Sequence, residues 1–198
     1  MKNYIKNIGL LFIAMGLFSC SSDDDTNNET TFTEENFFNG YLQATGFDEE
    51  IEIVELPNIF DGSEFGLDFT PKVKGKITAL KVKLPAVNPT LRITIWNKET
   101  NTILRTEIVN VATANSELSF DIPDVELIKD NQYAITMNTT DYFSRKNTAD
   151  EPVNYPIVVG NIQINAFKFN FTASQTYPSE TGDDFYDGDL SFDFIQTE

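Results

Sequence analysis

The strongest constraint on the fold is a strict two-residue alternation of apolar and polar side chains within short segments. Residues 91–97 (Leu-Arg-Ile-Thr-Ile-Trp-Asn) show it most clearly: three aliphatic side chains share one face of a strand, and Arg92, Thr94 and Trp96 share the other. A polar turn follows, and residues 102–109 are the expected hairpin partner. The rest of the chain past residue 35 shows no long apolar pattern of helical period.

Other short segments with strand patterns follow one another at intervals of about ten residues, which is typical of a sandwich. One of them, 161–171, changes phase by one residue, and this predicts a β-bulge. Seventeen phenylalanines suit an aromatic core between two sheets. We therefore predict an all-β, antiparallel β-sandwich of jelly-roll or immunoglobulin-like type over residues 36–198. Its strands are expected at 64–69, 76–84, 117–122, 132–138, 161–171 and 190–195, with an early edge strand around 50–56.

The N-terminus has the order of an export signal. Lys2 and Lys6 precede an apolar run over 8–18, which is shorter than the about 20 residues that a membrane-spanning helix needs. A serine and Cys20 follow, and this cysteine is the only one in the sequence, so it has no disulfide partner. The pattern predicts a signal peptide over residues 1–19.

The residues Leu-Phe-Ser-Cys at 17–20 resemble the bacterial lipobox, whose cysteine is lipidated and becomes the new N-terminus. Phe18 is bulkier than the usual occupant of its position. The resemblance implies that Cys20 carries palmitate-type acyl chains, and two or three such chains would hold the protein firmly to a membrane. The alternative is an ordinary signal peptide with an incidental cysteine.

Residues 20–35 are predicted to be an acidic, disordered tether, because 21–30 contain no apolar residue to bury. A cysteine followed by serines and an acidic cluster also resembles the signal that takes lipoproteins of Bacteroidota to the outer face of the outer membrane. This resemblance implies a lipid-anchored envelope protein of the outer membrane, exposed at the cell surface. A solvated linker that carries no such signal is the equally weighted alternative.

Charge and composition exclude several classes of function. Loss of Lys2 and Lys6 with the signal leaves 12 basic against 31 acidic residues. Such a surface repels phosphate backbones and anionic headgroups, so we expect no nucleic-acid partner and membrane attachment through acyl chains alone. The absence of histidine, with Cys20 reserved for lipid, removes cysteine-nucleophile and zinc-hydrolase chemistry, and no cofactor is expected apart from a calcium site considered below.

Three segments, 62–80, 91–97 with 103–106, and 128–133, together with 183–194, resemble a family of bacterial domains of unknown function found in surface and carbohydrate-active proteins. In that family a tryptophan-bearing strand follows two earlier strands, and a turn precedes a strand with tyrosine. Asp130 and Asn131 stand here where the family usually has glycine. The resemblance implies a β-sandwich and assigns no activity.

Trp96 is the first candidate for ligand binding. Strand alternation places it opposite the aliphatic face, where an exposed indole would stack on a sugar ring. We favour the alternative, in which Trp96 fills space under a loop or against a sheet edge. Tyr142 and Arg145 are further candidates, in a segment interpreted as a loop beyond a strand, although an ordinary loop is the favoured interpretation.

The second candidate site is an acidic segment near the C-terminus. Asp183, Asp184, Asp187 and Asp189 lie within seven residues that also contain a glycine, and such a loop could supply oxygens to calcium. Phe185 stands where an EF-hand needs an oxygen ligand, so a solvated acidic loop is the favoured interpretation.

Three hypotheses on function follow. The first is a non-catalytic, membrane-anchored binding module, with a glycan as the most plausible ligand. The second is a polysaccharide hydrolase that uses paired carboxylates about 5 to 10 Å apart. The third is a component of an envelope protein complex that binds its partner through an exposed strand edge. We favour the first hypothesis, in which the protein is not an enzyme.

Overall fold

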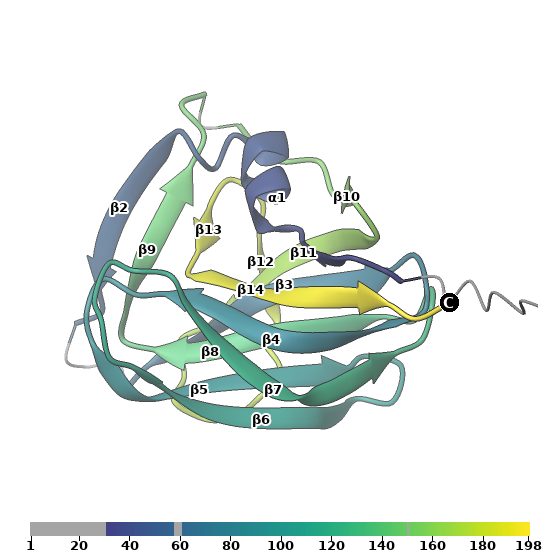
Figure 1. The fold of residues 1–198 in the computed structure, drawn as a ribbon. Helices are drawn as coiled ribbons and strands as arrows, with labels where there is room; N and C mark the ends of the chain where they lie inside the picture. The colour runs from purple at the N-terminus through teal and green to yellow at the C-terminus, as the bar shows by residue number, and fades with distance from the viewer. Residues whose placement is uncertain (1–30, 58–60, 150) are drawn as a thin grey trace, which may run out of the picture. The chain divides into compact units, whose positions relative to one another are not determined.

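A computed structural model describes residues 31–57, 61–149 and 151–198, and antiparallel strands make up most of it (Figure 1). The described elements belong to one unit, Phe32–Glu198. In chain order they are β1 (Glu34–Asn36), α1 (Phe38–Thr45), β2 (Glu50–Glu55), β3 (Ser63–Pro71), β4 (Gly75–Lys83), β5 (Asn88–Asn97), β6 (Thr102–Val111), β7 (Leu118–Leu127), β8 (Tyr133–Thr139), β9 (Asp141–Lys146), β10 (Ile157–Val159), β11 (Ile162–Asn170), β12 (Glu180–Gly182), β13 (Tyr186–Asp187) and β14 (Asp189–Gln196).

The strands form two sheets that pack face to face and a smaller third sheet beside them. The four-stranded sheet has the order β1-β14-β4-β7, and the seven-stranded sheet has the order β10-β11-β3-β8-β5-β6 with β12 also paired to β11. In Figure 1, β14 and β4 lie in one layer and β8 and β5 in the other. Across the interface the rings of Phe69 and Phe192 are 4.7 Å apart, centroid to centroid. The predicted all-β antiparallel sandwich is therefore confirmed.

The clearest predictions from alternation are also confirmed. β5 and β6 form the expected hairpin, and Leu91, Ile93 and Ile95 are buried in the core. The expected bulge in β11 appears as a register shift between Ile164 and Ala166 against β3. The early edge strand is β2.

The helix α1 and the strand β1 were not predicted. The side chain of Asn36 accepts a hydrogen bond from the backbone N–H of Phe38 at 3.0 Å, and Gly46 ends the helix with a left-handed φ of 74°. Because β1 pairs with β14, the fold begins at Glu34, inside the segment predicted as tether. In the part of the chain that the structure describes, no helix has the length and hydropathy to cross a membrane.

Candidate functional site

The middle of the outer face of the seven-stranded sheet, over β3, β8 and β5, is mostly buried. β3 is buried along its whole length, although only alternate residues, such as Phe65 and Phe69, face the sandwich core. Glu64 and Asp68 point to the opposite face, and the carboxylate side chain of Glu64 is 0% exposed. A sheet face on the outside of a sandwich normally contacts water, so another segment must cover this one.

That segment is the connection between β11 and β12, which we call the strap (residues 172–178). It crosses the outer face of β3, β8, β5 and β6 and is held there mostly through polar groups. Its hydrogen bonds to the sheet include Asn138 Nδ2 to Thr172 O (2.8 Å), Arg92 Nη2 to Ala173 O (3.1 Å), and Gln175 Nε2 to the hydroxyls of Thr94 (3.0 Å) and Thr106 (2.7 Å).

Under the strap, Glu64 is the centre of a chain of hydrogen bonds that crosses three strands. Arg92 on β5 donates from Nη2 to one carboxylate oxygen at 2.7 Å, and the Thr136 hydroxyl on β8 donates to the other at 2.6 Å. Trp96 in turn donates from Nε1 to Thr136 Oγ1 at 2.9 Å. The Nε of Arg92 is enclosed and has no hydrogen-bond partner among the described residues.

A second cluster lies further along β3, around Asp68. Lys98 Nζ donates to this carboxylate at 2.9 Å, and the Tyr177 hydroxyl of the strap donates to it at 2.7 Å. Lys98 also lies over the Tyr177 ring, 3.9 Å from its centroid. Burial and the neighbouring Asp68 raise the pKa of the Tyr177 hydroxyl, so this group stays protonated and donates.

Gly66, between the two carboxylates on β3, lets the neighbouring strand β8 approach closely. A Cβ atom at this position would lie 1.9 Å from the carbonyl oxygen of Ile135. Gly66 is the register partner of Thr136, which is the residue that reaches Glu64. The glycine thus permits the strand contact on which the Glu64 cluster is built.

Trp96 lies on the face that alternation predicted, opposite the aliphatic core side chains. It is 8% exposed, and its ring meets the ring of Tyr177 edge to face at 6.1 Å. The indole therefore packs under a loop, as the favoured interpretation of the sequence had it. The indole of Trp96 is thus not open to solvent.

The placement of Tyr142 and Arg145 in a loop was wrong. Both lie in strand β9, where Tyr142 is buried against Phe65 and Arg145 is 7% exposed. The guanidinium of Arg145 donates to both carboxylate oxygens of Asp189, at 2.6 and 2.7 Å. Because both faces of β9 are covered, the segment lacks the alternation that would have predicted a strand, and neither side chain is placed to meet a ligand.

The four aspartates of the C-terminal segment do not gather into a calcium site. Asp189 is paired with Arg145, and Asp187 lies on β13, where burial raises the pKa of its carboxyl to about 6 despite opposing effects of Ser144 and Lys146. Asp183 and Asp184 are exposed. Among the residues that the structure describes, no three acidic, histidine or cysteine side chains are grouped as metal ligands.

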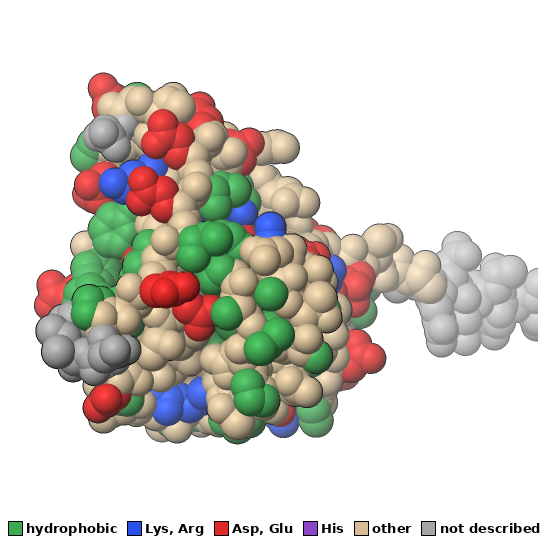
Figure 2. All heavy atoms as spheres, turned by 90° about the vertical axis from the view of Figure 1, so that its left-hand side faces the viewer, with side chains coloured by type: hydrophobic (Ala, Val, Ile, Leu, Met, Phe, Trp, Pro, Cys, Tyr) green, Lys and Arg blue, Asp and Glu red, His purple; other side chains and the backbone are tan. Residues whose placement is uncertain are grey.

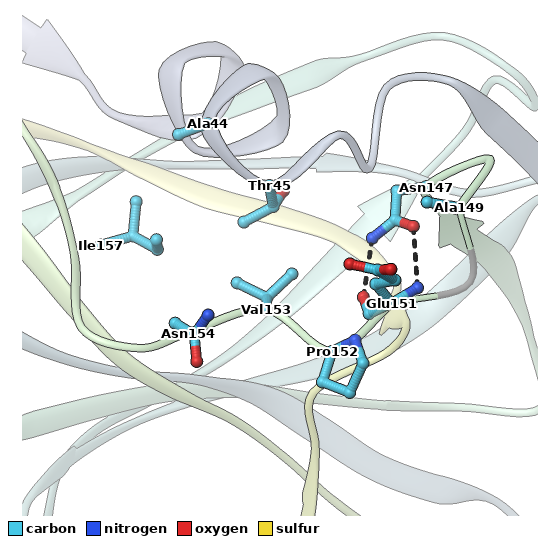
Figure 3. Close-up of a pocket in the computed structure, with 9 residues that line it drawn as sticks. All are labelled: Ala44, Thr45, Asn147, Ala149, Glu151, Pro152, Val153, Asn154 and Ile157. Carbon is cyan, nitrogen blue, oxygen red and sulfur yellow. Dashed lines mark hydrogen bonds between the residues drawn. The ribbon is translucent and has the colours of Figure 1, made fainter.

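A surface pocket of about 370 Å³ lies between the end of α1 and the segment that joins β9 to the start of β10 (Figure 3). Val153 and Ile157 contribute apolar side chains to its wall. The polar group of Asn147 is occupied, because its Nδ2 donates to Glu151 O at 2.9 Å and its Oδ1 accepts from Glu151 N at 3.1 Å. The pocket thus offers less recognition chemistry than the face under the strap.

No family model matches the chain, and no curated protein is significantly similar to it. Cys20, the predicted lipidation site, lies outside the described residues. Alternation had already placed Arg92 and Trp96 on one outward face, and the same pattern in 64–69 could have added Glu64 and Asp68 to it. Nothing in the sequence indicated that the strap would cross this face.

Proposed function

We propose that the chain is a lipid-anchored, non-catalytic binding module of the cell envelope, that its ligand is a glycan, and that the outer face under the strap is the ligand face. The observation that carries the proposal is the combination of carboxylates, cations, hydroxyls and an indole on adjacent strands, closed over by one short connection. The outward face of a sheet normally carries solvated polar side chains, and buried polar groups that pair with one another there call for an explanation.

The chemistry of this face fits a polyhydroxylated ring. Sugar hydroxyls both donate and accept, so they can bind the carboxylates of Glu64 and Asp68 and the charged nitrogens of Arg92 and Lys98. The indole of Trp96 offers an apolar surface to the C–H face of the ring once Tyr177 moves away. The enclosed Nε of Arg92 is a donor that a ligand oxygen would satisfy.

The strap makes with the sheet the same kinds of contact that a sugar would make. Tyr177 brings a hydroxyl and a ring, Gln175 brings an amide, and Ala173 brings a carbonyl oxygen. Its displacement exchanges one set of polar contacts for another, so the net cost of opening is modest. Ligand binding is therefore expected to compete with closure of the strap.

Binding is favoured over hydrolysis by the placement of the two carboxylates. Glu64 and Asp68 are four residues apart on β3, which separates their backbones by about 13 Å along the strand. Glycosidases use carboxyl groups about 5 to 10 Å apart. Each carboxylate is also already paired with a cation, Arg92 or Lys98.

The N-terminal sequence supports the anchored part of the proposal. Acylation of Cys20 would tie the domain to the membrane, and the acidic residues that follow would act as a spacer. With 31 acidic residues the chain gains nothing from anionic headgroups, so the acyl chains would carry the attachment.

A glycan array probed with the full chain tests the proposal. Specific binding is expected, lost in Asp68→Asn and Lys98→Met and strengthened in Gln175→Ala, which loosens the strap. Lys81→Met is the matched control, because Lys81 pairs with the buried Asp193 on the four-stranded sheet. Absence of binding to any glycan would overturn the proposal. An equal loss of binding in Lys81→Met would show that the ligand does not bind at the face under the strap. Calcium and chelator are compared in parallel, and binding is expected to be the same in both.

A further inference from the structure

β2 is the outermost strand of the three-stranded sheet β13-β9-β2. In the described part of the chain it pairs with β9 alone, so the backbone groups on its other edge are not used in a sheet. Two large apolar side chains of this strand are in contact with water: Ile51 is 50% exposed and Ile53 is 59% exposed. An open edge that carries exposed β-branched residues is a template for another strand.

Strand β2 also carries three acidic side chains. Glu50, Glu52 and Glu55 are all exposed, and none of the ion pairs formed among described residues involves any of them. On the neighbouring strand, Lys146 lies opposite Glu50 and Asp141 lies opposite Glu55 in the register. Figure 2 shows this side of the molecule, where hydrophobic side chains lie among acidic ones.

We infer that β2 is a docking edge for an extended segment of a partner protein in which basic and apolar residues alternate. The backbone of that segment would pair with the open edge of β2. Its apolar side chains would cover Ile51 and Ile53, and on the opposite face of the strand its lysines or arginines would lie beside Glu50 and Glu52. Opposite charges on neighbouring strands stabilise the pairing, and like charges oppose it.

Two other segments could pair with the open edge of β2, namely residues 21–30 of the same chain and the β2 strand of a second copy, and charge disfavours both. Residues 21–30 of the chain contain three aspartates, one glutamate and no basic residue, so they would be repelled by β2. A second copy of β2 would bring the glutamates of both copies to one seam. A basic partner segment is the occupant that remains.

The test uses the full chain and a fluorescent peptide, Lys-Val-Lys-Val-Lys-Val, with Glu-Val-Glu-Val-Glu-Val as the control peptide. Anisotropy is expected to show binding of the lysine peptide alone, weakening as salt rises. The variant Glu50→Lys/Glu52→Lys should bind the lysine peptide about tenfold more weakly and gain affinity for the glutamate peptide. Ile51→Thr/Ile53→Thr, which keeps β-branched side chains, should also weaken binding.

The matched control is Asp121→Lys/Glu126→Lys, which makes the same change of charge on β7, the edge strand of the four-stranded sheet. This control should bind the lysine peptide nearly as the unaltered chain does. Hydrogen exchange of the bound chain should show protection gained in β2. Failure to bind the lysine peptide, an equal loss in the β7 variant, or protection gained elsewhere would each overturn the inference. None of these variants alters the face under the strap, so glycan binding is tested independently.

Discussion

Two buried carboxylates of this fold are each held by an arginine, but different parts of the chain enclose them. Asp189 accepts two hydrogen bonds from Arg145 between β9 and β14, where both side chains are less than 10% exposed. Glu64 is held by Arg92 and Thr136 on the outer face, where the strap crosses over it and Arg92 is 21% exposed. One pair is enclosed by packed secondary structure and the other by a loop, so only the second can be uncovered without disrupting the core.

The largest expected effect is at the core pair. Arg145→Met leaves the Asp189 carboxylate buried without its cation, so the free energy of unfolding should fall by about 3–5 kcal/mol in a urea titration. Replacing both residues, in Arg145→Met/Asp189→Leu, should restore much of that loss. Lys146→Met, at an exposed neighbouring position, is the control and should change stability by less than about 0.5 kcal/mol. A loss below about 1 kcal/mol in Arg145→Met would show that this pair is not closed to water.

The corresponding change on the outer face should cost less. Arg92→Met leaves Glu64 with the Thr136 hydroxyl, and opening of the strap admits water to the carboxylate. We expect a loss of about 2 kcal/mol in the same titration, smaller than in Arg145→Met. Equal losses in the two variants would mean that the strap closes its face as tightly as the core closes around Asp189.

Asp187 extends the comparison, because it is a partly buried carboxylate that forms no ion pair among the described residues. Burial raises the pKa of this carboxyl in the folded chain to about 6, from an ordinary value of 3.8. The folded state therefore holds the proton more tightly, and the contribution of Asp187 to stability falls as the pH rises from about 4 to about 6. It stays low above that range.

The variant Asp187→Asn should accordingly be more stable than the unaltered chain at pH 7.5, on the order of 2 kcal/mol. The difference should largely disappear near pH 3.5, where the carboxyl is protonated in the folded state and mostly protonated in the unfolded state. Thermal unfolding at the two pH values measures it. A stabilisation that is independent of pH, or a loss at pH 7.5, would contradict the assigned cause.

The smallest effect is expected at the strap. Gln175→Ala removes hydrogen bonds to Thr94 and Thr106 in a partly exposed setting, so the global stability should fall by about 1 kcal/mol or less. Hydrogen exchange over 172–178 should quicken while that of β3 stays slow. Exchange that quickens equally in β3 would show that the strap and the sheet open together.

Much of the sandwich could be predicted because its strands have one covered face. In β5 the alternation predicted both the buried aliphatic residues and the outward direction of Arg92 and Trp96. β9 was missed because Tyr142, Phe143 and Arg145 are all buried on one side or the other, and this removes the period of two. α1 was missed because a short helix gains most of its stability from packing, here of Tyr41 against Phe47 and Tyr186.

The sequence by itself determined the fold class, the hairpin of β5 and β6, and the bulge in β11, because these depend on residue order within single strands. The residues around Cys20 predict export and lipidation, and this prediction lies outside the described residues. The pairing of Arg145 with Asp189, the cover that residues 172–178 place over Glu64, and the open edge of β2 were decided only by tertiary structure. Each of them joins or separates segments that are far apart in the chain, and such contacts depend on how the sheets are stacked, which no local pattern of residues specifies.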